Sequence, residues 1–350
     1  MSYSNIDKST NFFNTKLYTG NGGTQSITGV GFQPDWSWFK KRNNAADSSL
    51  IDAVRGVRKS LTSNNAEAEY TETTGLASWD SDGFSFDGAG YDHVNTNGDT
   101  FASWNWKAGT AVSGNTSGSG TYKTYTGSVN TTAGFSIIKY VGNGTAGHTI
   151  PHHLGIAPKM VIVKSVGANE DWMVGHTSVG FNKFMILNSD VRDASGTQWN
   201  STTPTNSVFS IGSNNNMNQN GNSFIAICFA EKTGYSKIGS YTGNNQTGNN
   251  APFIATGFAP TFLLVKKYSN SNHWIMWDNK RSTKNGFNII DKKLYANIAN
   301  AENGAEDVSF LSNGFKFNTN TGDWNESEDY LYLCFGQSIV GSNNVPCTAR

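Results

Sequence analysis

Charged residues are scarce in this 350-residue chain: Asp, Glu, Lys and Arg make up only 15% of it, and 26 basic residues balance 26 acidic ones. A nucleic-acid-binding domain concentrates positive charge on one face. Here lysine and arginine are scattered along the chain, and the formal net charge is +0 at pH 7. We therefore expect no nucleic-acid partner.

Long apolar runs are also lacking. No stretch reaches the roughly 18 apolar residues that a membrane-spanning helix needs. The first residues contain no apolar core of the kind found in a secretion signal. We expect a protein that is made in a cytoplasm and is not inserted into a membrane.

Cysteine is rare as well. The three cysteines are Cys228, Cys334 and Cys347, so at least one has no partner, and none lies at metal-ligand spacing. The sequence therefore predicts reduced thiols and no disulfide framework.

The chain is rich in the residues of strands and turns. It has 38 glycines, 13% aromatic residues and many Asn, Ser and Thr. Aromatic residues favour strands, and Gly, Asn and Ser favour turns. We predict an all-β protein, and its length favours two or three compact units.

One pattern occurs three times. A Tyr-X-Gly-Asn motif is followed by a proline and, six residues later, by a lysine at the end of an apolar run. Because proline suits a strand entrance, each apolar run is the expected strand. The copies are Tyr18 to Asn21 with Pro34 and Lys40, Tyr140 to Asn143 with Pro158 and Lys164, and Tyr241 to Asn244 with Pro260 and Lys266.

Each copy ends with a further apolar strand. A period of two places one set of side chains on a common face, which we predict to be core. This face comprises Ala102, Trp104 and Trp106, then Ile225, Ile227 and Phe229, then Leu331, Leu333 and Phe335. Copies one and three also share a hairpin signal, at Asp82-Gly83 and Asn313-Gly314.

The sequence therefore predicts three tandem β-sandwich units of a jelly-roll-like type. The expected division is an N-terminal arm (1–16), unit 1 (17–107), a Gly/Ser/Thr-rich linker (108–122), unit 2 (123–235), unit 3 (236–337) and a C-terminal tail (338–350).

Catalytic signals are weak. There is no phosphate-binding loop, dinucleotide fingerprint or nucleophile elbow. Asp80 and Asp82 have the spacing of a calcium loop or a glycosidase pair, but Asn313 at the matching place favours a turn. The histidines at 148–153 have no counterpart in the other copies, which argues against a metal site. We expect no catalytic residue, cofactor or metal, and no enzyme activity.

Aromatic residues beside polar loops are the remaining candidates. A ring that stacks on a sugar, with amides bonded to its hydroxyls, is one way to bind a glycan. The alternative is that these rings pack in the interior. The candidates are Trp172, His176, Trp199, Trp274, Trp277 and Trp324.

The chain resembles a repeat family found among virion proteins of marine tailed bacteriophages. The resemblance extends over essentially the whole chain and rests on Tyr18 to Asn21, Gly29 to Pro34, Asp52 to Gly56, Ser81 to Phe84, Trp104 to Lys107, Ala133 to Ile137, Ala157 to Met160 and the ending Asn343 to Arg350.

The resemblance implies a structural protein of the virion, made in the host cytoplasm, and brings no catalytic residues. A tail fibre or spike component that contacts a receptor or glycan on the host surface is the first hypothesis. A capsid-associated or decoration protein is the alternative, and a polysaccharide hydrolase is a remote one. The expected partners are other virion proteins and further copies of this chain.

Overall fold

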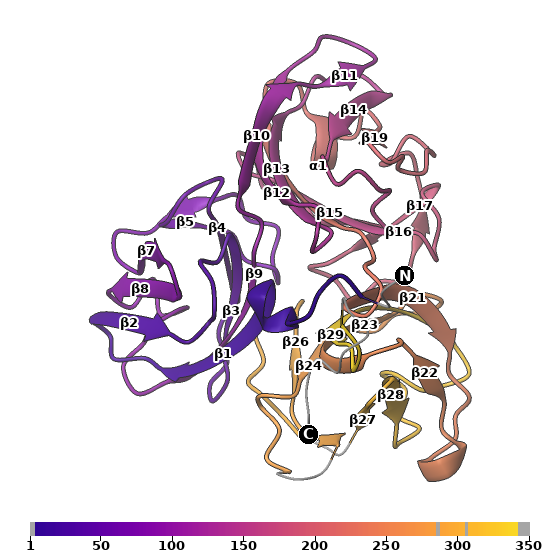
Figure 1. The fold of residues 1–350 in the computed structure, drawn as a ribbon. Coiled ribbons are helices and arrows are strands. Elements are labelled where there is room, and N and C mark those ends of the chain that lie inside the picture. Colours follow the sequence, from indigo (N-terminus) through magenta and orange to yellow (C-terminus); the bar gives the residue numbers. More distant parts are fainter. Residues whose placement is uncertain (1–3, 285–287, 305–306, 342–350) are drawn as a thin grey trace.

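The computed structural model describes residues 4–284, 288–304 and 307–341 and is all-β, as predicted. Three β-sandwich units surround a common centre (Figure 1). Helical segments within the described residues are short: η1 (Ser9–Asn11), α1 (Asn215–Asn218) and η2 (Gly248–Asn250). None of the described helices is long and apolar enough to cross a membrane.

Unit 1 packs a four-stranded sheet, β1-β9-β3-β4, against a three-stranded sheet, β2-β8-β7, and adds the short pair β5-β6. Its strands are β1 (Phe13–Thr19), β2 (Thr24–Thr28), β3 (Trp36–Lys41), β4 (Ser49–Asp52), β5 (Lys59–Ser60), β6 (Tyr70–Thr71), β7 (Leu76–Asp80), β8 (Gly83–Asp87) and β9 (Thr100–Trp106).

Unit 2 has a larger sheet, β10-β12-β13-β20-β15-β16-β17-β18, and a smaller one, β11-β14-β19. Its strands are β10 (Thr110–Asn115), β11 (Ser117–Gly118), β12 (Thr124–Asn130), β13 (Phe135–Val141), β14 (His148–Pro151), β15 (Met160–Ser165), β16 (Met173–His176), β17 (Lys183–Ile186), β18 (Ala194–Ser195), β19 (Val208–Ile211) and β20 (Ser223–Phe229).

Unit 3 packs β21-β29-β23-β24-β26 against β22-β28-β27-β25. Its strands are β21 (Ser236–Thr242), β22 (Phe253–Ala255), β23 (Ala259–Lys267), β24 (Trp274–Asp278), β25 (Ile289–Ile290), β26 (Lys293–Tyr295), β27 (Val308–Leu311), β28 (Gly314–Phe317) and β29 (Asp329–Gln337).

The larger sheets have the same strand order at their centres, β1-β9-β3-β4, β13-β20-β15-β16 and β21-β29-β23-β24, which agrees with the threefold sequence pattern. Pro34 and Pro158 lie two residues before β3 and β15, and Pro260 lies at a register irregularity in β23. The two predicted hairpins form between β7 and β8 and between β27 and β28.

Residues 108–122 do not form the linker that the sequence predicts. They contain β10 and β11, which pair with β12 and β14 and extend both sheets of unit 2. The small polar residues that are typical of a flexible linker also suit exposed edge strands. The arm also ends earlier than expected, because β1 begins at Phe13.

The central strands β9, β20 and β29 are buried on both faces. The face predicted as core packs against the other two units and forms one common interior of the molecule. The opposite face packs within its own sandwich, where Phe101, Phe224 and Tyr330 are fully buried. The prediction of a core face is confirmed, but the second face is buried too.

Three aromatic rings meet at the centre of this common interior, one from each unit. The ring centroids of Trp106 and Phe229 are 6.2 Å apart, and each lies 5.9 Å from the centroid of Phe335. Phe13, the first residue of β1, stacks on Phe335 with ring centroids 5.0 Å apart, and Ile6 of the N-terminal arm is buried in the same interior. We call the rings of Trp106, Phe229 and Phe335 the axial triangle.

The Tyr-X-Gly-Asn motif performs the same task in each unit, which unit 1 illustrates. The Tyr18 hydroxyl donates to the carbonyl of Val94 at 2.6 Å, and the backbone N–H of Asn21 donates to the side chain of Asn95 at 3.0 Å. A Cβ on Gly20 would lie 2.3 Å from the Thr96 carbonyl oxygen, so the loop requires glycine there. The same bonds join Tyr140 to Met217, Asn143 to Asn218, Tyr241 to Trp324 and Asn244 to Asn325.

The repeated lysine of each unit bonds to one of the other two units. Lys40 Nζ donates to the carbonyl of Ile298 in unit 3 at 2.9 Å, Lys164 Nζ to Ala66 in unit 1 at 3.1 Å, and Lys266 Nζ to Asp190 in unit 2 at 2.8 Å. All three side chains are buried. These bonds run from unit 1 to unit 3, from unit 3 to unit 2 and from unit 2 to unit 1, and so close a ring.

Truncation of the axial triangle should destabilise the whole molecule. We expect Phe229→Ala to lower the free energy of unfolding by about 3–5 kcal/mol, because it removes a ring that touches both other units. Chemical denaturation should still show one cooperative transition for all three units. Phe253→Ala is the control, since Phe253 is 45% exposed and its loss should cost less than about 0.5 kcal/mol. Separate transitions for the units in the wild type would contradict a shared interior.

We call the bonds of Lys40, Lys164 and Lys266 to neighbouring units the lysine ring. These three buried lysines should make the free energy of unfolding rise with pH above neutrality. Burial lowers the pKa of Lys40 and Lys164 to about 8 and that of Lys266 to about 7. An unfolded lysine titrates near about 10.4. Between these values the unfolded chain binds more protons than the folded chain, so raising the pH favours the folded chain.

We expect the free energy of unfolding to rise by on the order of 1 kcal/mol per lysine between about pH 7.5 and 9.5. The carbonyl bonds of the ammonium groups oppose part of the effect of burial. Denaturant titrations at several pH values measure this rise, and Lys164→Met should reduce it by about a third. An unchanged slope in that variant would exclude Lys164 as a source of the pH dependence.

Candidate functional site

All six side chains proposed from sequence as surface contacts are buried. Trp199, Trp274, Trp277 and His176 are 0% exposed, and Trp172 and Trp324 are 1% exposed. The expectation that they lie on the surface is therefore wrong. The polar residues beside them in the sequence lie at the ends of strands. The rings themselves face inward, where their strands pack against other parts of the protein.

Trp172 and Trp274 seal boundaries between units. The indole N–H of Trp172 in unit 2 donates to the carbonyl of Thr62 in unit 1 at 2.8 Å. The indole N–H of Trp274 in unit 3 donates to the carbonyl of Ile186 in unit 2 at 2.9 Å. Both rings hold neighbouring units together.

Each of the other three candidate tryptophans packs within the sandwich of its own unit. Trp199 packs edge-on against Phe181 at 5.6 Å in unit 2. Trp277 and Trp324 pack edge-on against each other at 5.6 Å in unit 3, and Lys293 Nζ lies 4.3 Å from the Trp324 ring centroid. A buried cation over a buried ring stabilises the core.

His176 occupies a position that holds an ion pair in the other two units. Its strand partner is Met160, and at the matching register Trp36 pairs with Asp52 and Phe262 with Asp278. Asp52 binds Arg55 at 2.5 Å, and Asp278 binds Arg281 at 2.5 Å. Unit 2 has Val179 where the others have arginine, so no ion pair forms there.

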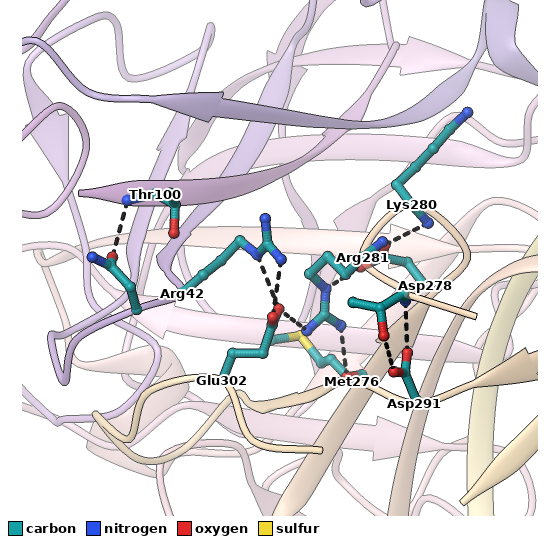
Figure 2. Close-up of polar contacts among 10 residues, drawn as sticks. Arg42, Thr100, Met276, Asp278, Lys280, Arg281, Asp291 and Glu302 are labelled. Carbon is teal, nitrogen blue, oxygen red and sulfur yellow. Dashed lines mark hydrogen bonds and ion pairs between the residues drawn. The ribbon is translucent and has the colours of Figure 1, made fainter. Parts of the chain in front are cut away.

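Figure 2 shows the ion-pair network at the boundary of units 1 and 3. Arg281 donates to Asp278, to the carbonyl of Met276 at 3.0 Å and to Glu302 at 3.1 Å. Arg42 of unit 1 binds the same Glu302 at 2.9 Å. Because Arg281 is fully buried and every contact is satisfied within the protein, this cluster fixes the boundary.

An accessible cavity of about 550 Å³ lies at the boundary of units 1 and 2. Unit 1 supplies most of its walls through the β3–β4 loop, the segment around β6 and the β8–β9 loop, and unit 2 supplies Asn169. We call it the Tyr91 pocket. Its lining residues are Asp47, Thr62, Glu67, Ala68, Tyr70, Tyr91, His93 and Asn169.

Two tyrosines dominate one wall of the Tyr91 pocket. Tyr91 is 60% exposed and meets Tyr70 edge-on, with ring centroids 5.4 Å apart. Tyr70 is held by a hydrogen bond of 3.0 Å between its hydroxyl and His93 Nδ1. Tyr91 and Asp92 have φ values of 45° and 65°, in the left-handed region that few residues other than glycine adopt. Such backbone is retained where the surroundings fix it, often at binding sites.

A buried acid lies against the loop that carries Tyr91. The carboxylate of Glu72 is close to two glycines: a Cβ on Gly75 would lie 2.4 Å from Glu72 Oε2, and a Cβ on Gly90 would lie 2.3 Å from it. Burial raises the pKa of Glu72 to about 7 and lowers that of His93. Gly90 directly precedes Tyr91, so the Glu72 carboxylate lies against the backbone of the loop that carries the ring.

Among the described residues no group of three His, Cys, Asp or Glu side chains is placed to bind a metal ion. Cys228 and Cys334 are buried, and burial raises the pKa of Cys228 to about 12. Asp82 accepts bonds from the N–H groups of Gly29 and Gly31 and serves the turn.

Sequence reasoning did not find the Tyr91 pocket. The fold brings together residues from 47 to 169, and no motif links them. The one local signal was the run Gly88 to His93, in which two glycines precede an aromatic residue.

His176 should contribute to acid sensitivity. Its Nδ1 accepts a bond from the Ser178 N–H at 3.1 Å, and burial lowers its pKa to about 4, below the unfolded value of about 6.5. Between these values the unfolded chain binds the extra proton, so stability falls as the pH drops. From pH 6.5 to 4.5, we expect His176→Gln to lose less stability than the wild type, by up to about 1.4 kcal/mol per pH unit.

Thermal melts of the wild type and of His176→Gln across this pH range measure the difference in stability. That difference isolates the contribution of His176. His152, whose pKa burial also lowers to about 4, contributes to both proteins equally, as does Glu72, which acts in the opposite direction. Parallel pH profiles would show that His176 is not responsible.

Comparison with known proteins identifies a family. No curated protein and no solved structure matches the chain. A family model described as a domain of unknown function (DUF7483) matches residues 8–338, which takes in all three units and part of the arm. The three-unit body around the axial triangle is thus the extent of a single family, and the chain belongs to the DUF7483 family.

Proposed function

We propose that this protein is a non-enzymatic structural protein of a bacteriophage particle and that it contacts the host cell surface as part of a tail fibre or spike. In this proposal it assembles with other virion proteins and with copies of itself. The proposal is supported by the resemblance of its repeats to phage virion proteins and by a surface pocket suited to a ligand.

The Tyr91 pocket is the observation that carries the receptor-contacting role. The six candidate side chains from the sequence analysis are buried. Tyr91 is exposed, and Tyr70 holds its ring by an edge-on contact. A fixed, exposed aromatic ring provides contact area at low entropic cost, as in binding surfaces generally. The pocket also lies between two units that pack against each other in one common interior.

The non-enzymatic part of the proposal is supported by the state of the candidate nucleophiles and bases. Cys228 is a buried thiol of raised pKa and Lys40 donates to two backbone carbonyls. Both are committed to packing or to bonds inside the protein. In the pocket, Asp47 accepts from Asn64 at 2.5 Å, and Asn169 accepts from the Ala68 N–H at 2.8 Å.

A capsid-associated or decoration protein is the second candidate. It is favoured by the compact body of three units, because the described residues contain no long shaft of the kind that a fibre uses to reach a cell. A compact body suits a position on the shell as well as one at the tip of a tail.

Immunogold labelling of intact particles distinguishes these roles. We expect antibodies raised against the purified protein to label the tail and to reduce adsorption of the phage to its host. Preimmune serum is the control. Label spread over the head would reject the tail assignment in favour of decoration, and particles without label would reject the virion proposal altogether.

A further inference from the structure

We infer that the Tyr91 pocket binds a carbohydrate with free hydroxyl or amino groups and without acidic groups. This inference rests on the proposed function for the place where the sugar is met, the host surface. It depends on three features of the pocket: its aromatic wall, its polar rim and its charge.

The aromatic wall is specific to this boundary. The three boundaries between units share one backbone bond, from Glu69 N to Val166 O, from Asp193 N to Tyr268 O and from Glu302 N to Arg42 O. The residue after each donor is Tyr70, Ala194 and Asn303, respectively. Since alanine and asparagine serve the same boundary elsewhere, the fold does not require a tyrosine at this position.

The exposed Tyr91 ring is placed to stack on a ligand. The Tyr91 ring is 60% exposed, so a ligand that covers it removes apolar surface from water. The edge-on contact with Tyr70, at an interplanar angle of 78°, holds the ring while leaving it accessible. The apolar C–H face of a sugar ring is a partner of matching shape for an aromatic face.

The rim offers oxygen and amide groups at fixed positions. Asn64 orients the Asp47 carboxylate, and the Ala68 N–H orients the Asn169 carboxamide. Asn65 donates to the Glu67 carboxylate at 3.3 Å. Each carboxylate is an acceptor with several lone pairs, so one protein donor leaves room for ligand donors. Hydroxyl and ammonium groups are such donors.

The charge of the pocket excludes acidic ligands. Asp47 and Glu67 are both acidic, His93 is neutral at pH 7 because burial lowers its pKa, and none of the described lining residues is lysine or arginine. A phosphate, sulfate or carboxylate in the pocket would meet two carboxylates in the lining, while the nearest ammonium groups, those of Lys40 and Lys164, are buried behind it and bonded to backbone carbonyls. Neutral and amino sugars meet no such repulsion, and the volume of about 550 Å³ falls in the usual range for small-ligand sites.

Binding of the purified full chain to an array of neutral, amino and acidic oligosaccharides tests this inference, followed by calorimetry with the sugar retained. We expect retention of a neutral or amino sugar and at least tenfold weaker binding by Tyr91→Ala. Tyr122→Ala is the matched control, because Tyr122 is 61% exposed but lies outside the pocket, and it should bind as the wild type does. Asn169→Ala should also weaken binding, with thermal melts showing that each variant is folded.

Three outcomes would overturn the inference: no sugar retained, retention of acidic sugars only, or equal binding by Tyr91→Ala and the wild type. Release of reducing ends from the retained sugar would also overturn it, because the pocket would then be a hydrolase site. The array requires no virion, so its result is separable from the location of the protein. A sugar-binding protein found on the head would retain the inference and remove the proposed function.

Discussion

The structure depends on the burial of the inner faces of three sheets against one another. Each central strand has apolar side chains on both faces, and only one face can be covered within a sandwich. The other face would expose large aromatic residues to water, at a cost of about 25 cal/mol per Å² of apolar surface. The units therefore associate, and the axial triangle is where all three meet.

The polar motifs of the repeat serve this association. The lysine ring and the indole N–H groups of Trp172 and Trp274 satisfy carbonyls that the boundaries remove from water. The Tyr-X-Gly-Asn motif holds the loops that precede the central strands. The same chemistry recurs in three places, and the Asp-Arg pair recurs in two of them. Unit 2 lacks that pair, with His176 in its place, so the boundaries are similar without being identical.

Much of the architecture could be predicted from the sequence, because it depends on local patterns. Repeated motifs predicted three units, prolines marked strand entrances and the period of two identified a core face. The error at residues 108–122 arose because small polar residues suit an edge strand as well as a linker. The aromatic candidates failed for a different reason. Trp172 and Trp274 lie beside polar loops in sequence, but their exposure is set by a neighbouring unit, which no local pattern reports. The Tyr91 pocket was inaccessible to sequence reasoning, since Asn169 reaches it from another unit.

The closed ring of contacts has a consequence for synthesis of the protein on the ribosome. Unit 1 bonds forward to unit 3 through Lys40, and Phe335 of the axial triangle belongs to β29, the last strand among the described residues. Until that strand emerges, the inner faces of the first two units have no complete covering. Nascent chains therefore carry exposed aromatic surface until β29 is synthesised, and chains interrupted before it are natural substrates for chaperones and proteases. β29 thus acts as the checkpoint for the integrity of the three-unit body.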